Sequence, residues 1–259
     1  MRALFANKMR VLFAILGSLL ILFVAWPLAR TVISSSPAVL WRTLLDEEVR
    51  GSIFLTFYAS LLATGLAFLC GIPLAYLLAR VDFPGKQLVE GIIDVPIIVP
   101  HSAAGIALLM VLGRRTLLGK AFGLVGLKFV SATPGIVAAM LFVSLSFLVD
   151  SAREGFEAVD PRLEKVARTL GASPWRAFWA VSFPLAWRSI LSGMVLMWAR
   201  GLSEFGAVVI LAYHPMVAPI LLYERFESFG LRYARPIATL VILTCLAIFA
   251  ALRLIAGGE

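Results

Sequence analysis

Residues 51–79 read GSIFLTFYASLLATGLAFLCGIPLAYLLA, a stretch of 29 residues without a charged side chain. An α-helix rises about 1.5 Å per residue, so this stretch is long enough to cross the roughly 30 Å hydrocarbon core of a bilayer. The whole chain shares this character, because 61% of its 259 residues are hydrophobic, only 15% are charged and its mean hydropathy is +0.96. Soluble domains average about 45–50% apolar and about 25% charged residues. The composition therefore indicates a membrane protein.

Further uncharged runs of similar length extend on both sides of this stretch. They predict an all-α membrane protein with six transmembrane helices, over residues 11–30, 52–79, 94–113, 133–150, 188–212 and 235–254. The first run is longer than the apolar core of a secretory signal, about 7–15 residues, so we interpret it as a retained span. Pro215 and Pro219 interrupt the stretch 213–233, which favours a short helix or a re-entrant loop and leaves a seventh span as the alternative.

These helices suggest how the chain is divided and oriented. We expect an N-terminal helix and outer loop over residues 1–49, a transmembrane domain over 50–254 and a short cytoplasmic tail over 255–259. An even number of spans places both termini on one side, and twelve Lys and Arg residues against ten weakly favour the cytoplasm. The predicted outer loops carry a net charge of +5, which suits either an anion pathway or a rim facing lipid headgroups.

The polar segment between the fourth and fifth predicted spans shows signals of two short helices. Asp160 followed by Pro161 is a typical helix start, and Gly171 stands where a left-handed residue would end that helix. Between them an apolar stripe is predicted on one helical face, formed by Leu163, Val166, Ala167 and Leu170. Ser173-Pro174 repeats the start signal. The first helix is either a lever on which a partner acts or an interfacial helix, with Trp175 and Trp179 at the lipid surface.

The same segment carries a family resemblance. Residues 165–175, KVARTLGASPW, followed by Val181-Ser182-Phe183-Pro184, resemble the cytoplasmic loop of importer-type ABC transporter permeases. Their pattern is Glu-Ala-Ala, three residues, Gly, nine residues and Ile-x-Leu-Pro, and its spacing is kept here. Lys165, Val166 and Phe183 depart from the family's Glu, Ala and Leu, so the polar contact of that glutamate with the ATPase would have to come from the neighbouring Glu164.

The resemblance implies a type I ABC importer transmembrane fold with a coupling segment at about residues 157–176. It implies that the chain forms a homodimer in the cell membrane, works with two copies of a separate ATP-binding subunit and receives its solute from an extracytoplasmic binding protein. The residues expected to couple to the ATPase are Asp160, Leu163, Glu164, Lys165, Val166, Ala167, Leu170, Gly171 and Pro174.

Two further stretches are similar in particular to molybdate/tungstate permeases. They run from Phe83 to Ala107 and from Trp198 to Val209, with a continuation through residues 212–226 that resembles the archaeal branch. Sulfate permeases share much of this sequence, so the resemblance implies import of a tetrahedral oxyanion, with molybdate or tungstate as the first expectation and sulfate or thiosulfate as the alternative.

Charged residues inside the predicted spans are candidates for the translocation pathway. Arg200 and Glu204 lie four apart, so they can pair on one helical face. Charges within a membrane usually face the protein interior and carry function, so this pair is either a gate or a structural ion pair. His101 and Ser102 follow Pro100 near the start of the third span, where a bend is expected. His101 either guides an oxyanion or is hydrogen-bonded between helices.

Several functions lack the residues they need. The pairs Gly85-Lys86 and Gly119-Lys120 are followed by Gln87 and Ala121, so no phosphate-binding loop is present and the chain itself is not expected to be an enzyme. The cysteines and histidines are few and scattered, so we expect no metal and no cofactor. We expect the lipid bilayer and no nucleic acid as partner. An ion-driven secondary transporter would need inverted repeats and buried acidic relays, and a membrane enzyme would need convergent polar groups.

Overall fold

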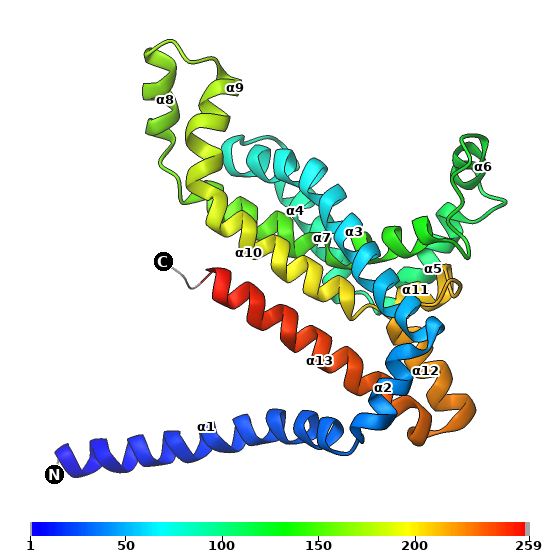
Figure 1. Cartoon of the computed structure of the whole chain (residues 1–259). Helices are drawn as coiled ribbons and strands as arrows, with labels where there is room; N and C mark the ends of the chain where they lie inside the picture. Colours follow the sequence, from blue (N-terminus) through cyan, green and yellow to red (C-terminus); the bar gives the residue numbers. More distant parts are fainter. Residues whose placement is uncertain (1, 257–259) are drawn as a thin grey trace. The chain divides into compact units, whose positions relative to one another are not determined.

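The computed structural model describes residues 2–256, with side chains from 9 to 250, and this part of the chain is built from helices without a strand (Figure 1). The helices are α1 (Arg2–Ile33), α2 (Pro37–Leu45), α3 (Glu47–Arg80), α4 (Lys86–Ile98), α5 (His101–Leu112), α6 (Leu117–Leu124), α7 (Thr133–Glu157), α8 (Pro161–Thr169), α9 (Pro174–Ala177), the π-helical turn η1 (Phe178–Ser182), α10 (Phe183–Leu202), α11 (Gly206–Leu211), α12 (Ala218–Phe229) and α13 (Leu231–Ala256). The predicted all-α class is confirmed.

Five helical segments within the described residues are long and apolar enough to cross a membrane. They are Met9–Ile33, Glu47–Arg80, Thr133–Glu157, Pro174–Leu202 and Leu231–Ala250. The consecutive helices α4 and α5 form a sixth candidate if the bent pair counts as one span. The predicted stretch 213–233 contains the short helix α12, as the two prolines favoured.

The third predicted span is broken. α4 and α5 meet at an angle of 117°, with Val99 and Pro100 between them. Proline disfavours helical geometry in the residue before it and cannot donate a backbone hydrogen bond, so the helix ends at Ile98 and a new one starts at His101. The expected bend is confirmed, but residues 94–113 are not one continuous helix.

The predicted bounds of the fifth span, 188–212, were wrong. The helical path runs without interruption from Pro174 through η1 to Leu202, and residues 203–205 then separate it from α11. At this turn Oε1 of Glu204 accepts the N–H of Ala207, in the first turn of α11, at 2.8 Å. The prediction took the helix limits from the ends of the uncharged runs, and these do not mark the break between α10 and α11.

The chain divides into two compact units, each with its own contacts. One contains the residues up to Ile53 and those from Leu221, and the other contains Phe54–Ile220. In the first unit the Ser35 and Thr239 hydroxyls lie 3.0 Å apart, joining the end of α1 to α13, and Arg225 pairs with Glu48. The boundaries at residues 49 and 254 expected from the sequence stay a prediction, and residues 257–259 of the expected tail lie outside the described residues.

The second unit is built around the close packing of α7 against α10. A Cβ added at Gly193 would lie 2.7 Å from the Cβ of Ser151, so only a glycine allows this approach. Small residues at helix contacts are typical of membrane proteins, where van der Waals packing replaces the hydrophobic effect as the driving force. α3 contributes a buried stripe of alanines to the same core, formed by Ala59, Ala63, Ala67 and Ala75. This core fixes the two ends of α10, at which the polar residues gather.

Candidate coupling surface and charged cluster

The segment between α7 and α9 folds as its sequence signals predict. Asp160 caps α8 by accepting the N–H of Arg162 at 2.8 Å, and Ser173 caps α9 by accepting the N–H of Arg176 at 3.2 Å. Gly171 has a φ of +90°, in the left-handed region that side chains with a Cβ disfavour, and it turns the chain between the two helices. The predicted helix over 161–170 is confirmed to within one residue.

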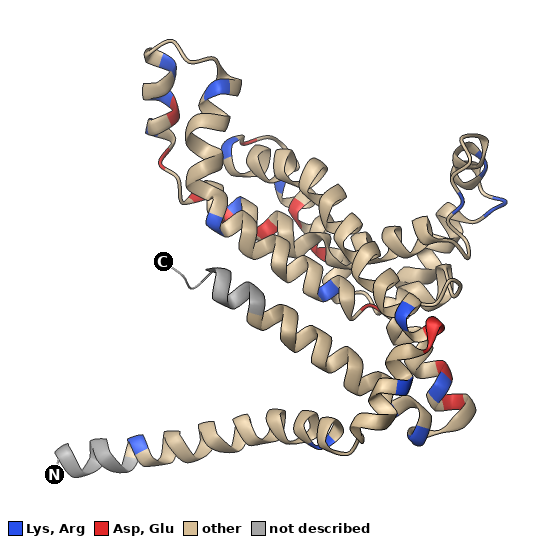
Figure 2. Ribbon diagram, viewed as in Figure 1, with Lys and Arg blue, Asp and Glu red and all other residues tan. Residues whose placement is uncertain are grey.

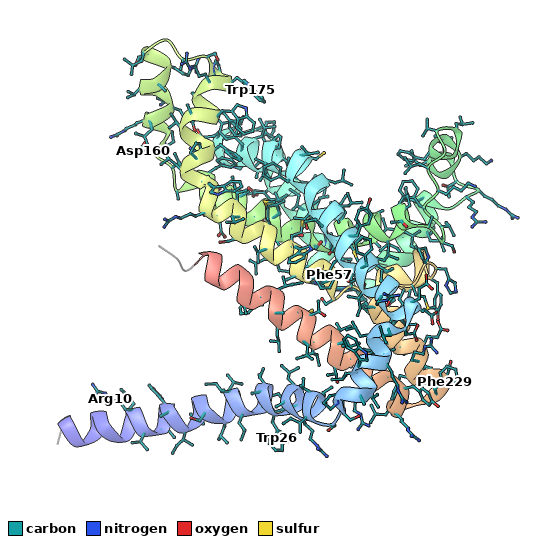
Figure 3. The ribbon with its side chains drawn as sticks, viewed as in Figure 1. Arg10, Trp26, Phe57, Asp160, Trp175 and Phe229 are labelled. Atoms are coloured by element: carbon teal, nitrogen blue, oxygen red, sulfur yellow. The ribbon has the colours of Figure 1, made fainter. Side chains whose placement is uncertain are left out.

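The apolar stripe of α8 lies on the outside of its unit. Leu170 is 83% exposed, and Leu163 and Val166 are exposed as well. Figure 3 labels Asp160 at the start of α8 and Trp175 on α9, with the side chains of this end projecting outward. Apolar residues on a short helix outside the predicted spans form a surface that suits a partner protein or a lipid interface.

The opposite side of α8 is anchored by one carboxylate. Glu164 accepts hydrogen bonds from the Tyr76 hydroxyl at 2.8 Å, from Nε of Arg80 at 2.8 Å and from the Ser182 hydroxyl at 2.6 Å. Arg80 also donates to the carbonyl of Val159 at 2.9 Å. Tyr76 and Arg80 belong to α3 and Ser182 to η1, so Glu164 joins α8 to two elements of the core.

The electrostatics of this anchor favour the ionised carboxylate. Burial of the Glu164 carboxyl opposes ionisation, but the hydrogen bonds from Ser182, Arg80 and Tyr76 and the charge of Arg80 outweigh it and hold the pKa of Glu164 below its usual range. Glu164 is therefore engaged within this chain, and its expected contact with an ATPase stays a prediction. The anchoring residues Tyr76, Arg80 and Ser182 were missed by sequence reasoning, although Arg80 is the first charge after the 51–79 stretch.

Aromatic rings surround the anchor. The ring of Tyr76 packs edge-to-face on Phe156, with centroids 5.3 Å apart, and on Phe178, at 4.9 Å. Phe178 in turn packs edge-to-face on Trp179 at 5.1 Å. Such aromatic pairs contribute about 0.5–1.5 kcal/mol each beyond their buried area. The rings therefore pack together α3, α7 and η1 at the junction to which α8 is anchored.

A second polar group lies at the other end of the Pro174–Leu202 helical segment. Arg200 is in the last turn of α10, Glu204 follows that helix and His101 starts α5. Nη2 of Arg200 lies 3.1 Å from Oε2 of Glu204 and 2.7 Å from both ring nitrogens of His101. Nδ1 of His101 lies 2.6 Å from the same Oε2, and the Glu204 side chain is 0% exposed. The structure thus brings together three of the four predicted pathway residues, and we call them the charged cluster.

The hydrogen-bonding capacity of these groups limits how they can pair. A guanidinium only donates and a carboxylate only accepts, so Arg200 donates to Glu204. The ring nitrogens of His101 donate to Glu204 or accept from Arg200 according to the tautomer. In this arrangement the charged cluster closes on itself and joins α5 to α10.

The backbone comes close to the charged cluster at Gly206. A Cβ added there would lie 2.7 Å from the Cβ of His101 and 3.2 Å from the backbone N of Ser102. Gly206 thus lets the start of α11 pack on the start of α5. Ser102, the fourth predicted pathway residue, is exposed at this contact and has no contact with Arg200 or Glu204 among the described hydrogen bonds.

One further ion pair, which the sequence did not predict, joins α4 to α7. Nη1 of Arg153 on α7 lies 2.9 Å from Oε1 of Glu90 on α4, and it fixes the first half of the broken pair against the core. Between residues 9 and 250, no group of three or more His, Cys, Asp or Glu side chains is placed to hold a metal ion.

Residues 71–257, which include α8, its anchor and the charged cluster, match the model of the family described as binding-protein-dependent transport system inner membrane component. The chain belongs to this family. It is 46% identical over 254 residues to a molybdate/tungstate transport system permease protein of Thermococcus kodakarensis, covering 96% of each chain. It is 34% identical over 209 residues to a probable sulfate transport system permease protein of Marchantia polymorpha, covering 79% of this chain and 73% of that one.

The family's fold is also found among solved structures. A chain in the crystal structure of a bacterial ABC transporter involved in the import of the acidic polysaccharide alginate superposes with a TM-score of 0.69, at 18% identity and with 96% of each chain covered. The expected ABC importer transmembrane fold is thereby confirmed. As a member of the family the chain is a multi-pass permease subunit of the membrane.

Proposed function

We propose that this chain is the membrane-spanning subunit of an ATP-driven importer for molybdate or tungstate. Two lines support the substrate: the relative with 46% identity is named for molybdate and tungstate, and the one named for sulfate is 34% identical over a smaller share of the chain. Molybdate, tungstate and sulfate are all tetrahedral dianions, so we expect the choice among them to lie mainly in the binding protein that delivers the anion.

The proposed assembly is a homodimer with two copies of an ATP-binding subunit and one extracytoplasmic binding protein. In this assembly both termini and α8 lie in the cytoplasm, and the charged cluster lies toward the extracytoplasmic side. The observation that carries the proposal is α8 itself, whose apolar stripe is exposed while its other side is anchored by Glu164. A helix held in this way presents a partner with a surface and transmits the partner's movement to the helices behind it.

Each residue of the segment has a part in this coupling. Leu163, Val166, Ala167 and Leu170 form the surface that docks on the ATPase, and Lys165 is exposed on the polar face of the same helix. Asp160 starts α8, and Gly171 turns the chain after it. Pro174 then starts α9, so these three residues set the ends of the lever. Closure of the ATPase dimer on ATP would then move α8, and the anchored α3 and η1 would follow.

The charged cluster is proposed as a gate. It joins the start of α5 to the end of α10, so it holds together two helices that must separate if an anion is to pass between them. Opening would separate Arg200 from Glu204, and a lone charge in a membrane costs about 2.5–3.5 kcal/mol on insertion scales. A passing dianion would offset this cost by pairing with Arg200, so the anion itself favours the open state for as long as it is present.

The deciding experiment measures ATP hydrolysis by the complete transporter, reconstituted in liposomes with its binding protein. We expect stimulation by molybdate or tungstate and not by sulfate. Stimulation by sulfate alone would assign the chain to the sulfate branch. Anion uptake that proceeds without nucleotide, driven by an ion gradient, would contradict the proposal and favour a secondary transporter.

A further inference from the structure

The loop between α5 and α7 exposes large apolar side chains that the core does not use. Its helix α6 is capped by Thr116, whose hydroxyl accepts the N–H of Gly119 at 3.0 Å. Leu117 is 86% exposed, Leu124 is 90% exposed, and Val125 is exposed beside it. In Figure 1, α6 projects from the end of α5 and away from α7 and α10, so the packed helices of its own unit leave these side chains free.

The charge of the same loop has one sign. Arg114, Arg115, Lys120 and Lys128 are all exposed, and the sequence has no Asp or Glu between Asp94 and Asp150. Figure 2 accordingly shows blue residues and no red ones on this loop. No described carboxylate forms a salt bridge with any of the four, and Arg114 donates to the carbonyl of Val130 at 3.4 Å. The loop is therefore a site of four positive charges without a salt-bridge partner among the described carboxylates.

We infer that the α6 loop lies in the bilayer interface and binds the headgroups of anionic phospholipids. The loop follows directly on the α4–α5 pair, a candidate span, and so emerges where the hydrocarbon core ends. Leu117 stands between Arg115 and Lys120, and Leu124 between Lys120 and Lys128. Interfacial helices place their leucines at the boundary of the acyl chains, while the Lys and Arg side chains extend toward the phosphates. This inference rests on the membrane location of the family and not on the proposed substrate.

The test places a probe on the apolar tip of the loop. The full chain, with Cys70 and Cys245 replaced by alanine, carries Leu124→Cys labelled with an environment-sensitive fluorophore. It is reconstituted in nanodiscs of phosphatidylcholine, with or without phosphatidylglycerol. Quenching by a doxyl-labelled lipid reports immersion in the bilayer, and quenching by acrylamide, which is neutral and so not attracted by the basic residues, reports exposure to water.

We expect strong doxyl quenching with phosphatidylglycerol and weaker quenching without it. Each Lys or Arg near an anionic surface favours the bound state by about fivefold, so changing all four to glutamine should lower the partition by more than about a hundredfold. The doxyl quenching of that variant should equal the value in phosphatidylcholine alone. High salt should reduce the quenching of the unaltered loop in the same direction, which tests the charge dependence without any substitution.

The matched control is the same label at Leu170, a leucine of similar exposure on α8. Its doxyl quenching should respond to phosphatidylglycerol much less, because Asp160 and Glu164 lower the net charge of residues 160–170 to +1, against +4 for the α6 loop. Three results would overturn the inference. The Leu124 label could stay open to acrylamide in both nanodiscs, it could become protected only when the binding protein is added, or it could be protected from acrylamide without being quenched by the doxyl lipid, in which case a second copy of the chain would be the cover.

Discussion

The anchor of α8 and the charged cluster lie on one continuous helical segment and use their charges in opposite ways. Ser182 and Arg200 are 18 residues apart in the sequence, which corresponds to about 27 Å along a helix. At the first site a carboxylate holds a helix whose apolar face is left free, and at the second the charges close on one another with Glu204 fully buried. The anchored α8 is suited to receiving the movement of a partner. The charged cluster is suited to holding α5 and α10 together until Arg200 and Glu204 separate.

The largest expected effect comes from breaking the charged cluster on one side. Glu204→Ala leaves Arg200 without its buried partner, so we expect the stability to fall by about 3–5 kcal/mol. The double variant Arg200→Met/Glu204→Met removes both charges and should recover most of the loss. Thermal unfolding in one detergent compares the two, and a double variant no more stable than Glu204→Ala would show that the pair is not the source of the effect.

The apolar stripe of α8 should behave in the reverse manner, with function lost and stability kept. Val166→Gln and Leu170→Gln place polar groups on a surface that is exposed in the isolated chain, so unfolding should hardly change. Coupled transport should fall by roughly tenfold or more if these side chains are central to the contact with the ATPase.

Thr169→Gln is the matched control for the stripe, since Thr169 is exposed on the polar side of the same helix. It should leave both stability and transport close to normal. Equal loss of transport in Thr169→Gln and Val166→Gln would contradict the assignment of the stripe as the docking surface.

The anchor itself should give an intermediate effect. Glu164→Gln replaces hydrogen bonds to a charged group, each worth about 1.5–3 kcal/mol, with weaker neutral ones. We expect faster hydrogen exchange in α8 and reduced coupling of ATP hydrolysis to transport. Tyr76→Phe removes a single donor and should show a smaller change in the same direction, whereas unchanged exchange in both variants would separate α8 from its base.

The pH dependence of the anchor follows from the sign of its shift. The pKa of Glu164 is lowered on folding, so its stabilisation is fully present above the unfolded-state value of about 4.3 and is lost as the pH falls through the folded-state value. The difference in unfolding temperature between the unaltered chain and Glu164→Gln should be constant from neutral pH down to about 5. It should shrink only in stronger acid, and a difference that changes between pH 6 and 8 would identify another group as its cause.

The smallest expected effect comes from two glycines with left-handed backbone, and comparing them distinguishes backbone strain from a role in coupling. Gly171 and Gly85 have φ values of +90° and +91°, and a Cβ at either position would meet nothing within 4 Å. Alanine at each should cost about 1 kcal/mol because of the left-handed backbone. Only Gly171→Ala should also lower coupled transport, because Gly171 sets the end of the lever, and an equal loss in Gly85→Ala would show that the effect is merely one of stability.

The sequence by itself determined the membrane class, the approximate spans and the short helix with its caps and apolar stripe. These features depend on local properties, namely the length of uncharged runs, the period of apolar residues and the chemistry of Asp160-Pro161 and Gly171. The likeness of residues 165–184 to permease loops also lies within one short stretch of chain. Nothing distant in the sequence has to be known for any of these.

Only the tertiary structure decided how distant residues combine. Glu164 meets Tyr76 and Arg80, which precede it by 88 and 84 positions, and His101 meets Arg200 across 99. It also decided that the fifth span ends at Leu202, where residues 203–205 separate α10 from α11 and the carboxylate of Glu204 bonds the first turn of α11. Charged side chains within a membrane must find partners, and the sequence shows that the charges exist, while the packing of α3, α5, α7 and α10 selects which of them meet.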